Sequence, residues 1–513
     1  MTSTTPPRST AVAPTPPPAT DADAAVPPPI LPEQEVAEER SPARRWVTLG
    51  LTAAVIVSST VAIFLPLKPE AIGVSAIVLM LCLIFLRMPV AVAMLVPALL
   101  GMYGLRGPLV VESMLSDLPY QQVASWTLSV VPMFILMGLF LWKAGLTESL
   151  YAAGRQWLGW LPGGLAVGTN IAGAGLASVS GSTVGTTYAL ARIGIPEMLK
   201  AGYDKRLAIG AVIVAGLPGQ LIPPSIMMVI YAGIAEVPVG PQLLAGVGPG
   251  ILVAVLFTVM IVIFARKWAV PNKAIVVAPT SWGTRFSSLT KVWPVPLIIA
   301  VIIWGTFSGT FTATEAGAVA ALVSLFIILI WKRGNGPFRA VADASIATIS
   351  SVGAIFFMLI GVEALSRMFT LTGISSGFAT LIDNLDLGRV PFLLLMTVVY
   401  IALGTFMEPL PMMVLTIPIL IPTLNSLDIS LLWYGAFAVF MGELAIVTPP
   451  VGILAFIIHS ITKEKEVNQG QDISMNDVFN SCWYFMPMAV LVTVILIFFP
   501  EISTWLPELT SIE

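Results

Sequence analysis

Long apolar stretches with almost no charge recur along the chain from residue 46 onward, and they restrict its fold more than any other feature. A backbone inside lipid has no water to bond, so a chain that crosses a bilayer must form helices or a closed barrel. A crossing helix needs about 20 mostly apolar residues. The stretches that meet or approach this length are 46–66, 71–86, 128–142, 243–265, 293–308, 316–331, 390–403 and 484–499. The sequence therefore predicts an all-α polytopic membrane protein.

Composition excludes several classes of function. Only 10% of the residues are charged and the mean hydropathy is +0.92, whereas soluble domains carry about 25% charged residues. The net charge of −3 offers no basic surface for nucleic acid. His459 is the only histidine, so a His-pair metalloprotease cannot be assembled, and no histidine lies near the Ser-rich segment that a Ser-His enzyme would use. Cys82 and Cys482 lie in apolar surroundings and are expected to be small buried hydrophobes.

The first 45 residues differ from the rest of the chain. They contain Pro-Pro-Pro runs and an acidic patch, which is typical of a disordered segment. Arg40, Arg44 and Arg45 then precede the apolar run, and positive residues concentrate on the cytoplasmic side of membrane helices. We predict a Pro-rich cytoplasmic tail over 1–45 and an additional retained membrane helix within 46–69. The N-terminus would then be cytoplasmic.

The basic residues also predict two re-entrant hairpins. Both Lys143 and Lys200 are expected on the cytoplasmic side, so the small-residue segment 164–198 would dip into the membrane and return. The segment 388–424 would do the same from the periplasm. In the same scheme, 107–125 is a periplasmic connection.

Two halves of the chain repeat the positions of proline and glycine residues at an offset of 226 residues. At this offset Pro196 coincides with Pro422, Gly216 with Gly442, and the pair 223–224 with the pair 449–450. Each half then holds a hairpin followed by a helix broken at a proline pair, over 206–234 and 430–460. Because the halves would enter from opposite sides, we predict inverted repeats, which in transporters bind ions and substrate at such breaks.

Four segments carry the chemistry expected of such a site: 178–183, 219–225, 404–409 and 445–450. Proline frees backbone carbonyls, which with Ser and Thr hydroxyls are hard oxygen ligands suited to Na⁺, and helix N-termini attract carboxylates. Close helix packing or simple kinks would give similar patterns. The candidate Na⁺ ligands are Ser180, Gly181, Gly219, Ile222, Gly404, Thr405, Ala445 and Thr448. The candidate substrate-binding residues are Ser182, Thr183, Pro224, Ser225, Glu408 and Pro450.

Charged residues at membrane depth are costly and are functional candidates. Glu408 and Glu443 are of this kind, although each is equally consistent with a partner for a helix end. Arg192 is expected to pair with a carboxylate that the sequence does not identify. Glu315, three residues after Thr312, is expected to cap a helix.

An ordered series of motifs over about 70–509 resembles the large permease subunit of tripartite ATP-independent periplasmic transporters. These motifs are Gly181-Ser182, Ile195–Met198, Gly202–Arg206, Leu221–Ser225, Thr312–Ala316, Gly404–Pro409 and Thr448–Gly452. One departure is Leu217-Pro218, which stands where the family tends to have a glycine-rich run.

The resemblance implies an elevator-type importer driven by a Na⁺ gradient. Such a permease of the bacterial inner membrane works with a four-helix small membrane subunit and takes an organic acid from a periplasmic binding protein. Na⁺ would act as the coupling ion, and the tips and breaks would hold it together with the substrate. Two alternatives stay open on the sequence: a stand-alone Na⁺-coupled dicarboxylate carrier and, more remotely, a membrane-embedded enzyme.

Overall fold

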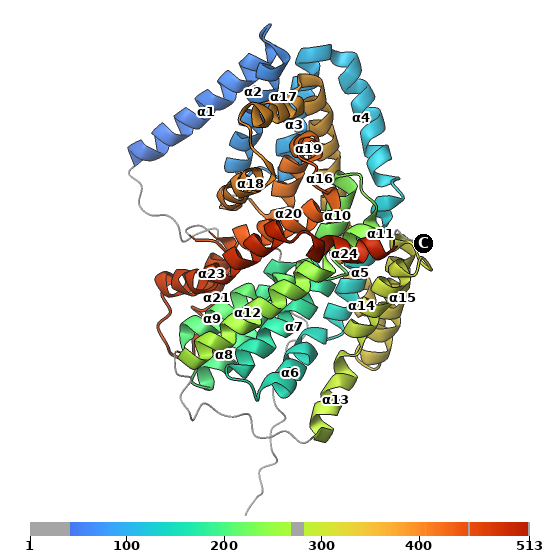
Figure 1. Cartoon of the computed structure of the whole chain (residues 1–513), viewed down its shortest axis with the longest axis vertical. Coiled ribbons are helices and arrows are strands. Elements are labelled where there is room, and N and C mark those ends of the chain that lie inside the picture. Colours follow the sequence, from blue (N-terminus) through green and yellow to red (C-terminus); the bar gives the residue numbers. More distant parts are fainter. Residues whose placement is uncertain (1–41, 268–281, 406, 450–451, 511–513) are drawn as a thin grey trace, which may run out of the picture. The chain divides into compact units, whose positions relative to one another are not determined.

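The computed structural model describes residues 42–267, 282–405, 407–449 and 452–510 (Figure 1). Within these ranges the chain is helical and has no strand, which confirms the predicted all-α class. Contacts divide the chain into two units, 1–54 and 55–513; the boundary lies within the first helix, and all later helices belong to the second unit. Most of the predicted tail, residues 1–41, lies outside the described residues.

Helices near the N-terminus follow the predicted apolar stretches. Helix α1 begins at Pro42, four residues before the predicted start at 46, and ends at Phe64. It is followed by α2 (Pro69–Phe85), α3 (Val90–Arg106), α4 (Pro108–Val123), η1 (Thr127–Ser129), α5 (Val130–Lys143) and α6 (Leu146–Leu158). The predicted connection at 107–125 contains α4, which begins with Pro108 at its first turn.

The central helices are separated by glycine and proline. They are α7 (Gly164–Ser180), α8 (Thr183–Lys200), α9 (Lys205–Val214), η2 (Pro218–Gln220), α10 (Ile226–Ile234) and α11 (Val239–Ala245). Helices α12 (Val247–Lys267), α13 (Trp282–Val292), α14 (Pro294–Phe307), α15 (Ala313–Trp331) and α16 (Pro337–Thr372) follow. The C-terminal part contains α17 (Ile374–Asn384), α18 (Arg389–Gly404), α19 (Pro409–Ser426), α20 (Leu431–Ala445), α21 (Ile453–Ile461), α22 (Lys465–Asn468), α23 (Met475–Phe498) and α24 (Glu501–Thr510).

Five helical segments in the described residues are long and apolar enough to cross a membrane, or seven if two bent pairs each count as one span. The five are Val239–Lys267, α15, α16, α19 and α23, and the bent pairs are α4 with α5 and α13 with α14. The longest of them, α16, was missing from the predicted apolar stretches. Its apolar middle is interrupted by Ser and Thr and is flanked by Asp343 and Glu363. A search of the sequence for long apolar stretches therefore does not find this helix.

Helix bounds in the two halves follow the offset seen in the sequence. Adding 226 to the bounds of α8, Thr183–Lys200, gives Pro409–Ser426, the bounds of α19. Helices α7 and α8 meet at residues 180–183, called the first tip, and α18 and α19 meet at residues 404–409, called the second tip. The chain between α9 and α10 (215–225) is the first break, and that between α20 and α21 (446–452) is the second break.

Helices α7, α8, α9 and α12 pack on one another, and α16 packs elsewhere in the same unit. Figure 1 shows α7, α8, α9 and α12 grouped together, in agreement with their mutual contacts, whereas α16 runs beside α3 and α5. Of the five candidate spans, α19 is the most enclosed, with 67% of its apolar window buried inside the protein. The protein itself, rather than lipid, therefore surrounds most of α19.

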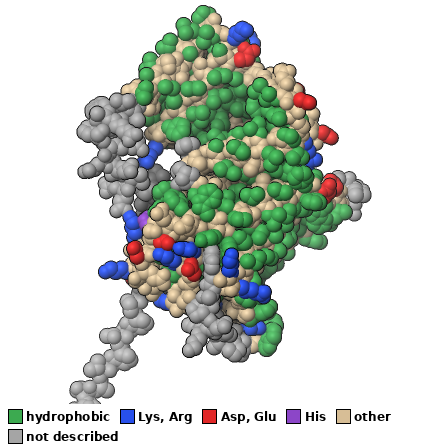
Figure 2. Space-filling model, turned by 60° about the vertical axis from the view of Figure 1, so that its left-hand side comes forward, with side chains coloured by type: hydrophobic (Ala, Val, Ile, Leu, Met, Phe, Trp, Pro, Cys, Tyr) green, Lys and Arg blue, Asp and Glu red, His purple; other side chains and the backbone are tan. Residues whose placement is uncertain are grey.

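Outward-facing helix surfaces are apolar, as a bilayer requires. On α15 the exposed side chains of Leu322, Phe326 and Ile330 follow one another at four-residue spacing and form one stripe. Figure 2 shows a face covered mostly by hydrophobic side chains, with charged side chains gathered toward its lower end. At the start of the same helix, Thr312 and Glu315 form the expected capping box.

Candidate functional site

The first tip is a tight turn that depends on glycine. Gly181 ends α7 with a φ of +65°, and a Cβ atom there would lie 2.2 Å from Ile226 Cδ1 at the start of α10. Ser182 caps α8, since the Gly185 N–H donates to its Oγ at 3.0 Å. Ser180 Oγ accepts from the Ser182 N–H at 3.4 Å and contacts Thr186 Oγ1 at 3.3 Å. Three candidate residues are thus held together in one turn beside α10.

The first break is buried and is shaped by its prolines. A cis peptide bond joins Pro223 to Pro224. Ser225 caps α10, because the Met228 N–H donates to its Oγ at 3.2 Å, and the same hydroxyl donates to the Gln220 carbonyl oxygen. Gly219 lies against α7, where a Cβ atom would be 2.3 Å from the Ala174 carbonyl oxygen. Ile222 is partly buried and Pro224 is buried.

The first break also contacts the N-terminus of α8 through Gln220. With its amide oxygen facing the tip, the fully buried Gln220 side chain accepts from the N–H groups of Ser182 and Thr183, each at 3.1 Å. The first backbone N–H groups of a helix have no partner within the helix, and in other proteins such N–H groups bind anions. A side-chain carbonyl therefore occupies the place at this helix end where a carboxylate oxygen would bind.

The second tip lies against the end of α20. A Cβ atom on Gly404 would lie 2.0 Å from the Ala445 Cβ, and one on Gly442 would lie 3.0 Å from the Pro409 Cβ. Thr405 Oγ1 donates to the Ala402 carbonyl at 2.7 Å, and Thr448 Oγ1 donates to the Leu444 carbonyl at 2.8 Å. Glu408 is the exposed residue that precedes α19. Pro450 lies outside the described residues.

Glu443 links the two halves. Its side chain is 1% exposed, and its Oε2 accepts a 2.6 Å hydrogen bond from Thr183 Oγ1 at the first tip. One turn of α20, from Gly442 to Ala445, therefore touches both tips: Glu443 reaches the first, while Gly442 and Ala445 lie against the second. No hydrogen bond between described residues connects Thr405 or Glu408 with the first tip.

The structure adds two residues to those the sequence singled out as site residues. Gln220 was quoted only as part of the first break, and Glu443 was an intramembrane carboxylate without an assigned partner. The local signal for both is a polar side chain within a few residues of a proline pair at membrane depth. Their partners could not be found in this way, because Thr183 and Glu443 are 260 residues apart in the chain.

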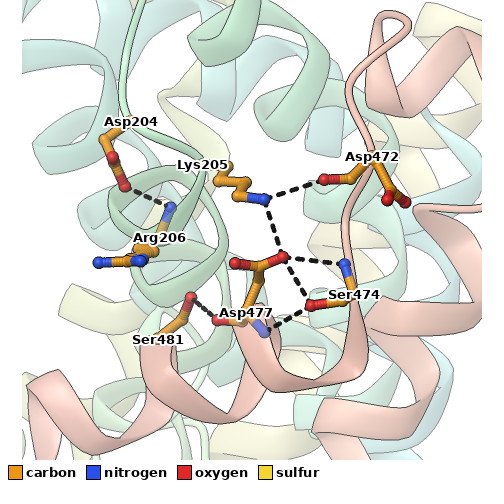
Figure 3. A network of polar contacts seen from close by, with 7 residues as sticks. All are labelled: Asp204, Lys205, Arg206, Asp472, Ser474, Asp477 and Ser481. Atoms are coloured by element: carbon orange, nitrogen blue, oxygen red, sulfur yellow. Dashed lines mark hydrogen bonds and ion pairs between the residues drawn. The ribbon is translucent and has the colours of Figure 1, made fainter.

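Ionic contacts hold the middle of α8 and the start of α9. Arg192 pairs with Glu464 at 2.6 Å, which supplies the partner the sequence left open. Lys205 Nζ donates to Asp477 Oδ2 at 2.8 Å and to the Asp472 carbonyl at 2.9 Å, so the start of α9 is tied to the start of α23 (Figure 3). Nearby, burial raises the pKa of the Tyr203 phenol, whose oxygen accepts from the Leu165 N–H.

A cavity of about 390 Å³ lies apart from the tips. It is bounded by the end of α10 and by α16, α17 and α19, and its polar lining includes Glu236, Glu363, Ser366 and Ser376. None of the candidate ligands named above lines it. The contacts at the tips, rather than this cavity, therefore mark the candidate site.

Comparison with known proteins places this arrangement in a family. A sequence profile described as "Tripartite ATP-independent periplasmic transporter, DctM component" matches residues 77–502. The C4-dicarboxylate TRAP transporter large permease protein DctM of Vibrio cholerae is 31% identical over 403 residues, covering 75% of this chain and 86% of that protein. The ectoine TRAP transporter large permease protein TeaC of Halomonas elongata is 27% identical over 437 residues, covering 84% and 97%.

Solved structures agree at the level of the fold. The Alcanivorax borkumensis YdaH transporter superposes with a TM-score of 0.57 at 16% identity, covering 85% of this chain and 98% of that one. Neisseria gonorrhoeae MtrF gives a TM-score of 0.58 at 10% identity, covering 88% and 97%. The matched relatives are transport permeases rather than enzymes. This chain therefore belongs to the DctM family, the large membrane permeases of tripartite ATP-independent periplasmic transporters.

Proposed function

We propose that this chain imports a small organic anion, a carboxylate, across the bacterial inner membrane by coupling its movement to a Na⁺ gradient. A periplasmic binding protein delivers the anion, and a four-helix small membrane subunit completes the membrane complex. The observation that carries the proposal is the meeting of both tips with one turn of α20 at Glu443. Relatives named for C4-dicarboxylate, ectoine and sialic acid transport support this range of cargo.

Na⁺ binds at the breaks because proline leaves carbonyl oxygens there without their usual helical donors. Pro223, Pro224 and Pro449 remove the i+4 donor of Gly219, Gln220 and Ala445, and of these the Gln220 carbonyl accepts from Ser225 Oγ and the Ala445 carbonyl from the Thr448 N–H. The Thr448 hydroxyl lies in the second break, and the Ser180 hydroxyl lies in the first tip. Oxygen atoms of this type are the ligands that a hard cation prefers.

The anion binds at the helix starts that the tips present. The N–H groups of Ser182 and Thr183 are held by the Gln220 amide oxygen, and a substrate carboxylate can replace that oxygen. The two helix pairs and two broken helices form inverted repeats and move together as the mobile body of an elevator, while helices such as α16 stay in place. The N-terminus is cytoplasmic.

Uptake by proteoliposomes tests this function. The chain is reconstituted with its small subunit, and uptake of radiolabelled C4-dicarboxylate, ectoine and sialic acid is measured with and without a Na⁺ gradient and the binding protein. We expect accumulation of one of them only when both are supplied. Accumulation without the binding protein would instead identify a stand-alone carrier, and accumulation without Na⁺ would reject the proposed coupling ion.

A further inference from the structure

Helix α13 has an apolar face that stays largely exposed, although Trp157 of α6 contacts the ring of Phe286 on it. Trp282, Phe286, Leu289 and Trp293, the residue that follows the helix, recur at spacings of four, three and four residues and so share one side. Their exposed fractions are 66%, 58%, 39% and 44%. With 11 residues, α13 is about 16 Å long and cannot cross a bilayer by itself. The exposed apolar face of α13 is therefore not explained as the lipid-facing side of a membrane-spanning helix.

The other sides of α13 define its orientation. Ser288 and Val292 are buried, and α13 packs against α6, where the Trp157 indole N–H donates to the Arg285 carbonyl at 3.1 Å. Ser287 and Lys291 are exposed on the side opposite the aromatic residues. Helix α13 is bent by 54° from the apolar helix α14, below which it lies in Figure 1. A short helix that has a buried, an apolar and a polar side, and that is bent away from the apolar helix following it, fits the plane of a membrane surface.

The charged residues of α13 indicate which kind of membrane surface it contacts. Arg285 stacks on Trp282 with its guanidinium carbon 5.1 Å from the ring centroid, and its buried Nε has no hydrogen-bond partner among the described residues. Neither Arg285 nor Lys291 forms an ion pair with a described carboxylate. The helix itself carries no acidic residue. Arg285 beside the exposed Trp282 and Lys291 on the polar side are two cations without an ion pair among the described residues, and together with the aromatic face they match anionic lipid headgroups above acyl chains.

We propose that α13 is a membrane-surface anchor whose aromatic face enters the headgroup boundary while Arg285 and Lys291 bind anionic phospholipid. The anchor fixes the outer side of α6, the helix that leads into the first helix pair. Association with the membrane surface at this point would therefore hold the base of α7 and α8 at a constant depth.

Label accessibility tests the depth of α13 in the full chain. In a C82A/C482A background, a spin label is placed at Phe286→Cys or, as a matched control one residue away on the other side, at Ser287→Cys. In phosphatidylcholine–phosphatidylglycerol vesicles we expect the label at 286 to collide with oxygen and to be shielded from a water-soluble nickel chelate, with the reverse at 287. Equal nickel access at both positions would reject the anchor. Immobilised labels at 286 that are shielded from both reagents would show that a protein, not lipid, covers this face.

Lipid preference tests the charge part of the proposal. A fluorescent label at 286 should be quenched more strongly by doxyl-labelled phosphatidylglycerol than by doxyl-labelled phosphatidylcholine. Each basic residue near an anionic surface contributes about fivefold to association, so Arg285→Gln and Lys291→Gln should each lower the preference by about that factor. Thr290→Gln, which changes no charge, is the control. A preference that is absent in the parent chain, or unchanged in both charge variants, would overturn the assignment.

Discussion

At the scale of single residues, the contact between Thr183 and Glu443 is the most informative. A buried carboxylate that loses its donor is left with a desolvation cost of about 1–3 kcal/mol. Thr183→Val should therefore lower the free energy of unfolding by about 1–2 kcal/mol, since hydrogen bonds within membranes are worth somewhat less. Thermal unfolding in detergent measures this change.

Thr183→Ser is the matched control, because it retains the hydroxyl that reaches Glu443 at 2.6 Å. The double variant Thr183→Val with Glu443→Leu should recover part of the loss, because it removes the stranded carboxylate as well. If the Val and Ser variants unfold at the same temperature, the hydrogen bond does not hold the tip to α20.

Glycine at position 404 is needed for the approach of α18 to α20. A Cβ atom there would overlap that of Ala445, so Gly404→Ala should cost about 1–3 kcal/mol through overpacking and should abolish uptake. Gly377→Ala provides the comparison, since nothing lies within 4 Å of its added Cβ and alanine favours a helix. Equal uptake by the two variants would show that the second tip does not need this close contact.

At the scale of helices, two ion pairs of different burial hold the middle of α8 and the start of α9. Lys205 and Asp477 are 29% and 15% exposed, whereas Arg192 and Glu464 are 46% and 44% exposed. Lys205→Met should therefore destabilise the fold by about 1–3 kcal/mol, and Arg192→Met by at most about 1 kcal/mol.

Thermal unfolding at low and high salt separates these two pairs. Salt screens exposed charges more than partly buried ones, so the small effect of Arg192→Met should vanish at high salt while that of Lys205→Met persists. If Arg192→Met loses more stability than Lys205→Met, then the contact of α8 with Glu464, which directly precedes Lys465 at the start of α22, contributes more to stability than the attachment of α9 to α23.

Local patterns predicted the helices far better than the contacts between them. The cap at Thr312 and Glu315 could be predicted because both residues lie within one turn, and the apolar stretches predicted most spans. Helix α16 escaped prediction because charged residues flank its apolar centre. The partners of Glu443 and Arg192 escaped it because no local periodicity encodes a contact between residues 260 or 272 positions apart.

At the scale of the whole molecule, the family region begins well inside the chain. The DctM profile starts at residue 77, so deletion of residues 1–39 should leave the proposed Na⁺-driven uptake within about twofold of the parent chain. This deletion keeps Arg40, Arg44 and Arg45, which are expected to orient α1. Uptake and membrane insertion are measured together; correct insertion with lost uptake would assign a transport role to the tail.

The length of α16 has a practical consequence for the study of motion in this protein. Its 36 residues make a rod about 54 Å long, longer than a bilayer core of about 30 Å. Phe338 and Leu371, both exposed, lie about 50 Å apart near its two ends. Spin labels at these positions give a fixed baseline for pulsed distance measurements. A third label on α8 or α19 can then be triangulated against that baseline, so that a sliding displacement is distinguished from a rotation.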